Sequence, residues 1–410
     1  DGREKAGSQE AGSQKTRRQE DAGQENRGEL RPVDLPVRDI SVSGYRSLRA
    51  ITYPMSRLDV FVGANGVGKS NLYRALDLLQ AAAQNQLGAR LAAEGLDLAM
   101  WAGPRKGKEP TRIALSVTLA APGARNSAFR YEVEVGFPQK VTAAAFELEP
   151  QVKAESLTYL SGQRRSRLVE RRNASVMARD AEGRPAELDI DLLSSETLLG
   201  RLEDPGRYPE LDAVRRTLLE WRFYHDVRTD ADSALRRPCV AVAAPTLASD
   251  GSNLAAVFAT LAHIRQDRRD LDEAVTSAFP GAVLSLPFPD RTATFGLRLP
   301  EFPQRFFEPA ELSDGTLRFL ALAGALLAYR LPPFIALNEP EASLHPDLME
   351  PLAALIAKAS ERTQVWLVTH SERLAQALKD HGAVRTVRKT DGATTIEGLT
   401  LFGAFKDDDD

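Results

Sequence analysis

The sequence predicts an α/β fold in which a mostly parallel sheet core carries an antiparallel β lobe and a helical insertion. Strand and helix patterns alternate through the last part of the chain, from about residue 316 to residue 399. Consecutive alternating strands without helices occupy residues 111–137, and a glycine-rich loop at 63–70 joins an apolar strand directly to a helix. Alternating strands and helices favour parallel pairing, whereas consecutive alternating strands favour an antiparallel sheet.

The chain begins with a polar segment and ends with an acidic one. Residues 1–30 hold almost no apolar side chains, so we expect them to be disordered. The folded region is expected at 37–400, and residues 405–410 are interpreted as a truncated purification tag or a native acidic tail. Within the folded region we expect the glycine-rich loop and β lobe at 37–190, the helical insertion at 191–280 and a second lobe at 281–400.

Strand patterns dominate the first lobe. Residues 37–43 alternate between apolar and polar side chains, and a turn at 44–48 leads into a second strand that ends at Tyr53. Further strands are expected at 58–63, 111–120, 129–137, 146–149, 157–160, 168–170 and 175–178.

Helical spacing begins in the insertion, and alternating strands and helices end the chain. The helices of the insertion are expected at 208–222, 251–264 and 271–279. Short strands follow at 283–286 and 294–299. The final series is expected as helix 316–329, strand 334–337, helix 347–360, strand 365–369, helix 372–378 and strands 384–388 and 394–399.

The glycine-rich loop matches the pattern G-x-x-x-x-G-K-[ST] at residues 63–70. In its strand–loop–helix context this pattern indicates a phosphate-binding loop, because backbone N–H groups and a helix N-terminus attract anions. Lys69 is expected to reach the β- and γ-phosphates of ATP, and the Ser70 hydroxyl to hold Mg²⁺. The expected cofactor-binding residues of this loop are Gly63, Asn65, Gly66, Gly68, Lys69, Ser70 and Asn71.

Three later stretches suit the rest of a nucleotide site. Residues 311–318 read E-L-S-D-G-T-L-R, and Ser313 suits the N-cap of the helix that follows. The strand at 334–337 ends in the sequence N-E-P-E at 338–341, which places carboxylates where Mg²⁺ and an attacking water are expected. His370 follows the next strand.

Composition limits the class of protein. The 410 residues contain no run of about 18 apolar side chains, and the polar N-terminus lacks a signal-peptide pattern, so no membrane contact is expected. Cys239 is the only cysteine, which suits a reducing cytoplasm. The net charge of −4 excludes a generally basic nucleic-acid-binding protein.

Together these motifs resemble those of the RecF/SMC/OLD-like ABC-type ATPases, specifically the compact bacterial AAA-family predicted ATPases without a TOPRIM domain. The resemblance extends over residues 37–400 and implies a P-loop NTPase fold of the ABC/SMC-head type. Residues 311–318 resemble the signature motif, 334–341 the Walker B strand, and 342–346 the D-loop. The resemblance is carried by residues 44–48, 63–71, 311–320, 337–346 and 368–371.

The resemblance also implies roles for individual residues in ATP hydrolysis. Glu339 would act as the general base, with Glu341 as the second candidate. His370 would sense the γ-phosphate, and Arg46 would approach the nucleotide. Asn338 would join Ser70 in holding Mg²⁺.

A homodimer formed on ATP binding is the next implication. The signature residues Ser313 and Gly315 of one subunit would close over ATP held by the phosphate-binding loop of the other subunit.

The sequence departs from the family pattern in three respects. Asn338 stands where SMC-type heads usually carry Asp. No clear Q-loop glutamine follows the first helix, although Gln80, Gln84 and Gln86 are candidates. Neither a long heptad arm nor an acidic TOPRIM module is present in the sequence.

The biological role is open between three alternatives. The first is DNA-associated work in repair or anti-phage defence, with DNA bound without sequence specificity. The second is a regulatory scaffold that controls a separate effector nuclease or toxin without binding DNA, and the third, least favoured, is a transporter ATPase. Basic clusters that could contact DNA lie at 105–108, 164–172, 236–237 and 265–269.

Overall fold

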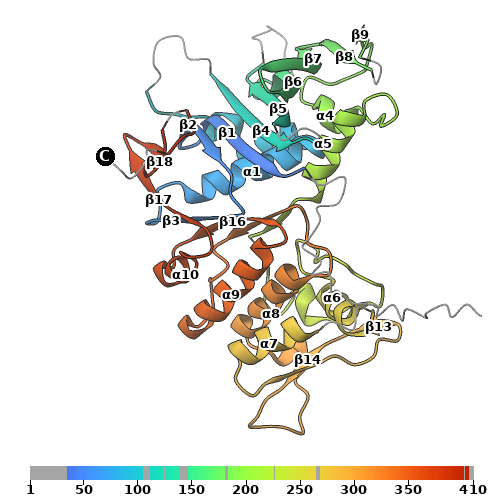
Figure 1. Ribbon diagram of the computed structural model, residues 1–410, viewed down its shortest axis with the longest axis vertical. Coiled ribbons are helices and arrows are strands. Elements are labelled where there is room, and N and C mark those ends of the chain that lie inside the picture. The colour runs from blue at the N-terminus through green and yellow to red at the C-terminus, as the bar shows by residue number, and fades with distance from the viewer. Residues whose placement is uncertain are drawn as a thin grey trace, which may run out of the picture.

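The computed structural model describes residues 35–104, 111–122, 126–138, 146–180, 183–225, 227–264, 268–400 and 402–405. The N-terminal segment expected to be disordered lies outside these residues, as do all of the tag-like end except Phe405, the basic cluster at 105–108 and Arg265. Two sheets and two groups of helices are stacked along the long axis of the molecule (Figure 1).

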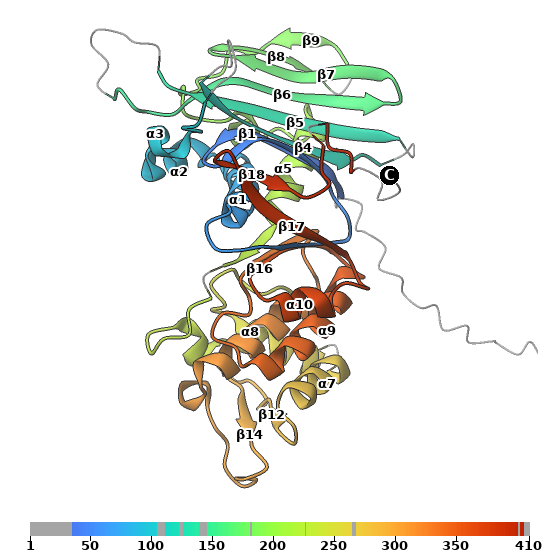
Figure 2. The same cartoon turned by 90° about the vertical axis from the view of Figure 1, so that its left-hand side faces the viewer.

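An eight-stranded antiparallel sheet forms one end of the molecule, in the order β2-β1-β4-β5-β6-β7-β8-β9 (Figure 2). It confirms the predicted β lobe. One face of each long strand is apolar and packs inward: in β4 the inward residues are Ile113, Leu115, Val117 and Leu119. The strands are β1 (Val37–Tyr45), β2 (Leu48–Pro54), β4 (Arg112–Ala120), β5 (Ser127–Gly136), β6 (Gln151–Ser161), β7 (Arg164–Arg172), β8 (Ser175–Arg179) and β9 (Pro185–Glu187).

The second sheet has the order β10-β15-β16-β3-β17-β18. Its first five strands are parallel, and β18 pairs antiparallel with β17. All six residues of β16 are buried, as expected for a central strand with both faces covered. The strands are β10 (Arg222–Tyr224), β15 (Phe334–Asn338), β16 (Gln364–Thr369), β3 (Leu58–Val62), β17 (Ala383–Thr390) and β18 (Ala393–Ile396).

Helix α1 (Lys69–Ala83) lies between the two sheets, and a second group of helices covers the other face of the parallel sheet (Figure 1). With α1 pack α2 (Leu87–Glu94), α3 (Leu96–Ala99), α4 (Leu198–Arg201) and α5 (Pro209–Glu220). The opposite face is covered by α6 (Leu254–Ala259), α7 (Arg269–Ala278), α8 (Asp314–Leu327), α9 (Met349–Ser360) and α10 (Glu372–Ala377). The short strands β11 (Cys239–Val240), β12 (Val283–Ser285), β13 (Thr292–Ala293) and β14 (Gly296–Arg298) form two antiparallel pairs, β11 with β13 and β12 with β14.

One buried side chain joins the two sheets directly. The amide of Gln364, at the start of β16, accepts a hydrogen bond from the Val37 N–H at 2.7 Å and donates one to the Val37 carbonyl at 2.8 Å. This pairing fixes the first strand of the antiparallel sheet against the parallel sheet, so the two layers have a defined orientation.

The segment expected as a helical insertion contributes to both hydrophobic cores. Its first helices, α4 and α5, pack with α1 against the antiparallel sheet. Its later helices, α6 and α7, pack with α8 and α9 on the other side of the parallel sheet. Between them β10 adds an edge strand beside β15.

The predicted elements differ from the structure most clearly in three places. The strand expected at 146–149 is wrong: these residues form a turn, and the side chains of Phe146 and Leu148 are 74% and 56% exposed. The helix expected at 208–222 ends at Glu220, because Arg222 begins β10. The helix expected at 251–264 begins at Leu254 and ends in a π-helical segment, Thr260–Ile264.

None of the helices in the described ranges combines the length and the apolar character needed to cross a membrane.

Candidate functional site

The loop predicted to bind phosphate lies at the carboxyl end of the parallel sheet, between β3 and α1. Gly68 has a φ of 99°, a left-handed conformation that favours glycine. A Cβ atom on Gly68 would lie 2.0 Å from the Thr394 hydroxyl oxygen and 2.4 Å from the Ser47 hydroxyl oxygen. These two hydroxyls are 2.6 Å apart, and the Asn71 amide donates to Ser47 at 2.7 Å. The loop therefore has its shape because β18 and the β1–β2 turn pack tightly against it.

Lys69, the lysine of the loop, is buried, with 3% of its surface exposed. Its ammonium donates hydrogen bonds to the carbonyls of Gly63 at 2.5 Å and Ala64 at 2.8 Å. Burial lowers the pKa of Lys69, and the negative charges of Glu339 and Glu341 partly offset that effect. The cation is thus held at the phosphate-facing loop by groups that a nucleotide phosphate can replace.

His370 connects the loop lysine to the carboxylate expected to act as the base. Its Nδ1 lies 3.1 Å from the Lys69 ammonium, and its Nε2 lies 2.7 Å from the Glu339 carboxylate. An ammonium can only donate, so Nδ1 accepts and Nε2 carries the proton that it donates to Glu339. Three residues from three strand ends therefore form one hydrogen-bonded chain, Lys69–His370–Glu339.

Glu341 has different surroundings from Glu339. One oxygen of its carboxylate accepts from the Thr369 hydroxyl at 2.5 Å, the His370 N–H at 2.8 Å and the Ser371 N–H at 3.2 Å. Ser371 in turn caps α10 by accepting from the Leu374 N–H at 3.1 Å. Glu341 therefore holds the turn that carries His370, which favours Glu339 over Glu341 as the group that meets a water.

Glu339 itself lies on a left-handed turn, with a φ of 48°. Its N–H donates to the Val368 carbonyl at 2.8 Å, which continues the pairing of β15 with β16 by one residue. Arg318, from the signature stretch, donates to the Glu339 and Pro340 carbonyls at 3.3 Å each. Sequence patterns do not reveal the contacts of Arg318, Thr369 and Ser47, because each has a partner distant in the chain.

Two buried oxygens beside these groups lack hydrogen-bond partners within the described residues: Asn338 Oδ1 and Glu341 Oε2. Asn338 ends β15, and Ser70 is the second residue of α1, beyond β3; one strand, β16, separates those two strands. Hydroxyl, amide and carboxylate oxygens are the ligands that Mg²⁺ prefers. The residues present thus fit a magnesium ion.

Arg46 and the candidate Q-loop glutamines have other partners. The guanidinium of Arg46 pairs with the Glu94 carboxylate at 2.8 Å and is directed toward α2.

Gln80 is buried and donates to the carbonyls of Leu218 at 3.0 Å and Trp221 at 2.8 Å, so it joins α1 to α5. Gln84 accepts from Arg90 at 3.2 Å, and Gln86 precedes α2.

The signature residues lie on a different surface. Ser313 is the N-cap of α8, and its hydroxyl accepts from the Thr316 N–H at 3.2 Å. A Cβ atom on Gly315 would lie 2.9 Å from the Ser343 carbonyl, so the helix start and the expected D-loop are in close contact. Ser313, Gly315 and Ser343 line a cavity whose other walls come from the end of α7 and from residues 345–348. No residue of the phosphate-binding loop lines this cavity.

The layered fold, with a glycine-rich loop after β3, is the P-loop NTPase fold of the ABC/SMC-head type. The chain belongs to the family described as "AAA domain, putative AbiEii toxin, Type IV TA system", whose model matches residues 60–375. Among curated proteins, none matches the sequence.

Solved structures show the same fold. One is an SMC head bound to the C-winged helix domain of ScpA, with 15% identity and a TM-score of 0.50 over 90% of this chain and 99% of that chain. Another is an SMC head domain with an extended coiled coil from Pyrococcus furiosus, bound to the C-terminal domain of ScpA. It has 13% identity and a TM-score of 0.50 over 90% of this chain and 97% of that chain. P-loop ATPases of this kind generally use a nucleotide with Mg²⁺.

Proposed function

We propose that the protein binds ATP with Mg²⁺, dimerises head to head around it, and hydrolyses it. The observation that supports this most directly is the Lys69–His370–Glu339 chain at the carboxyl ends of three neighbouring strands. A cation beside the phosphates and an acceptor for the proton of the attacking water are groups that phosphoryl transfer to water uses, and here an imidazole links the two.

Each residue has a distinct role in the proposed mechanism. Lys69 exchanges the Gly63 and Ala64 carbonyls for the β- and γ-phosphate oxygens of ATP, and N–H groups of the loop 63–71 bind the remaining oxygens. Ser70 and Asn338 would hold Mg²⁺, which neutralises phosphate charge when bound. Glu339 accepts the proton of the attacking water, while His370, fixed through Glu341, holds the Glu339 carboxylate and faces the γ-phosphate.

The separation of the two half-sites within one chain supports the head-to-head dimer. The cavity at Ser313 and Gly315 has no wall from the phosphate-binding loop of its own chain. Capped helix starts attract anions, so the start of α8 is suited to a phosphate that a second subunit presents. ATP bound to each loop would then lie between the two subunits.

The first version of the biological role is DNA-associated work in repair or anti-phage defence. The outer face of the antiparallel sheet supports it only in part, because several of its arginines are paired with carboxylates. Arg112 pairs with Glu134 at 2.6 Å, and Arg167 pairs with Glu170 at 2.6 Å. Arg171, from the same basic cluster, is buried and donates to backbone carbonyls.

These pairs favour the second version, in which the ATP-dependent dimer controls a separate effector protein. The family description names a toxin of a toxin–antitoxin system, and the similar SMC heads were solved with a bound ScpA domain. A partly neutralised β lobe, and the protein partner bound to the similar SMC heads, both suit a scaffold in the cytoplasm.

Light scattering with ATP, ADP or no nucleotide tests the proposal, with phosphate release measured in parallel. Association with ATP·Mg²⁺ but not with ADP, together with phosphate release, is the expected result. An unchanged monomer mass in all three conditions would reject the dimer mechanism. Fluorescence anisotropy of labelled duplex DNA separates the two roles: ATP-dependent, salt-sensitive binding supports the DNA role, and its absence supports the scaffold.

A further inference from the structure

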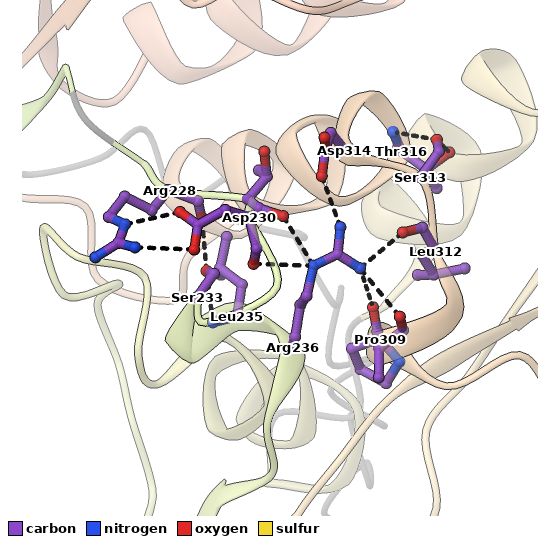
Figure 3. A network of polar contacts seen from close by, with 12 residues as sticks. Arg228, Asp230, Ser233, Leu235, Arg236, Pro309, Leu312, Ser313, Asp314 and Thr316 are labelled. Carbon is purple, nitrogen blue, oxygen red and sulfur yellow. Dashed lines mark hydrogen bonds and ion pairs between the residues drawn. The ribbon is translucent and has the colours of Figure 1, made fainter.

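Arg236 makes an unusually complete set of contacts with the segment that leads into the signature helix (Figure 3). It lies in a 3₁₀ turn, Ala234–Arg236, between β10 and α6. Its Nη1 donates to the carbonyls of Pro309 and Ala310 at 3.2 Å each and of Leu312 at 2.8 Å. Its Nη2 donates to the Asp314 carboxylate at 2.6 Å.

The same guanidinium is held from the other side. Its Nε donates to the carbonyls of Thr229 at 2.8 Å and Asp230 at 3.1 Å. That turn is itself fixed, because the Ser233 hydroxyl donates to the Arg228 carbonyl and Arg228 pairs with Asp230 at 2.8 Å (Figure 3). Arg236 therefore bridges two segments about 75 residues apart in sequence, and only 12% of its side chain is exposed.

These contacts fix the position of Ser313 without touching it. Leu312 immediately precedes Ser313 and Asp314 immediately follows it, and Arg236 binds both. The residues before Leu312 form a 3₁₀ turn, Pro309–Glu311, closed by a capping box between Glu308 and Glu311. The start of α8 thus depends on one planar side chain whose several N–H donors have fixed directions.

The ion pair has an electrostatic consequence as well. Asp314 is the first residue of α8, between the two signature residues, and 59% of its side chain is exposed. An uncompensated carboxylate there would repel the phosphate of a partner subunit. The guanidinium of Arg236, which is mostly buried and lies 2.6 Å away, offsets that charge.

We propose that Arg236 is a positioning residue of the signature half-site: it sets the entry of α8 and offsets Asp314, so that the helix start can accept the partner's ATP. This inference rests on the proposed head-to-head dimer. The inference assigns a role in that dimer to the segment between β10 and α6, which contains Arg236. This segment follows directly on β10, the neighbour of the Walker B-like strand β15 in the parallel sheet.

The test compares Arg236→Met with Arg237→Met. Arg237 is the neighbouring arginine, 66% exposed and 3.7 Å from Asp232, so it is the matched control. In Arg236→Met we expect monomer ATP affinity within about twofold of wild type, and ATP-dependent association weakened by about tenfold to a hundredfold, the range for lost charged hydrogen bonds. Arg237→Met should behave as wild type in both measurements. Equal association in the two variants would overturn the inference.

A rescue experiment isolates the charge effect. Adding Asp314→Asn to Arg236→Met removes the uncompensated carboxylate, so association should recover in part. Arg236→Lys should lie between wild type and Arg236→Met, because a single ammonium cannot reproduce the planar set of donors. If the double variant associates no better than Arg236→Met, the charge-offset role is rejected.

Mixing experiments show which half-site is damaged. Arg236→Met mixed with Lys69→Ala should regain ATPase activity, because an intact loop from one chain meets an intact signature from the other. Arg236→Met mixed with Ser313→Arg should not, because both chains then lack a working signature. If Arg236→Met does not fold, Arg236→Lys takes its place in both mixtures.

The outcomes separate this inference from the proposed function. A wild-type chain that never associates with ATP rejects the dimer and this inference together. ATP-dependent association of wild type with no selective defect at Arg236, or loss of ATP binding by the monomer in Arg236→Lys, rejects the positioning role alone.

Discussion

The two halves of the proposed ATP site differ in how much of each the single chain completes. At the phosphate-binding loop, Lys69 is 3% exposed and is linked through His370 to Glu339. At the signature, Ser313 and Asp314 lie on an exposed helix start, and Asp314 is 59% exposed. In the first region the proposed reacting groups are already hydrogen-bonded to one another within the single chain, whereas in the second the contacts of Arg236 hold an exposed helix start in place. ATP binding and dimerisation should therefore be separable by mutation.

Lys69→Ala should have the largest effect, because it impairs ATP binding, on which both dimerisation and hydrolysis depend. Loss of the only loop ammonium should weaken ATP binding by about a hundredfold or more, since hydrogen bonds to charged groups are strong. Association and turnover should then disappear. Titration with a fluorescent ATP analogue measures this, with Lys358→Ala on α9 as the control; unchanged affinity in folded Lys69→Ala would contradict the loop assignment.

Ser313→Arg should leave the phosphate-binding loop unchanged and abolish the function of the signature. The bulky side chain would fill the surface on which a partner's ATP is proposed to sit, so the monomer should keep its ATP affinity while association and turnover are lost. Mixing with Lys69→Ala should restore one composite site per heterodimer and part of the activity. If the two inactive chains form ATP-dependent heterodimers without turnover, the two sites are strictly coupled.

Glu339→Gln should leave both binding steps intact and affect only the chemical step. An amide cannot accept the proton of water, so turnover should fall by about 10²–10⁴-fold, the usual contribution of a general base. ATP should then hold the dimer closed, which size-exclusion chromatography would detect. A trapped dimer with Glu341→Gln and not with Glu339→Gln would exchange the roles of the two carboxylates.

Glu341→Gln should act on stability more than on chemistry. Its carboxylate accepts from Thr369, His370 and Ser371, and loss of the charge should cost about 1–3 kcal/mol of unfolding free energy. Urea denaturation measures the change. Glu350→Gln is the matched control, because Glu350 is 63% exposed and 3.8 Å from Arg373; an equal effect in both variants would contradict the anchoring role.

The smallest expected effect is a pH dependence of ATP affinity. Burial lowers the pKa of Lys69 from its ordinary value near 10.5. Lysine is cationic below its pKa, so the loop should lose its charge, and ATP affinity should fall, at a lower pH than for an ordinary lysine. Dissociation constants measured from neutral pH to above the ordinary lysine pKa would show this fall, and Lys69→Arg should lack it because arginine stays charged.

The same shift has the opposite sign for the stability of the nucleotide-free protein. Between the lowered pKa and the ordinary value, the unfolded chain binds more protons at this lysine than the folded chain does. The contribution of Lys69 to the unfolding free energy therefore rises with pH over that interval. ATP affinity and stability should change in opposite directions there.

The P-loop fold, the order of its motifs and the expected positions of site residues near strand ends can all be predicted from the sequence. These predictions succeed because strand–loop–helix patterns are local. Each can be recognised within about ten residues, as in the glycines and lysine at 63–70 and the apolar run before Asn338. The predicted strand at 146–149 is wrong because the prediction was also local. Alternation of side chains along the sequence does not show whether a hydrophobic core lies opposite them.

The hydrogen-bond partners of the polar groups, in contrast, depend on the tertiary structure and could not be predicted from the sequence. Lys69 and His370 are 301 residues apart, and Gln80, a Q-loop candidate in the sequence, reaches Leu218 across 138 residues. The difference between Glu339 and Glu341 arises from the turn after β16, and the setting of Ser313 arises from Arg236 on a separate segment. Hydrogen bonds depend on distances of about 3 Å between atoms, and sequence periodicity carries no information on which distant residues come that close.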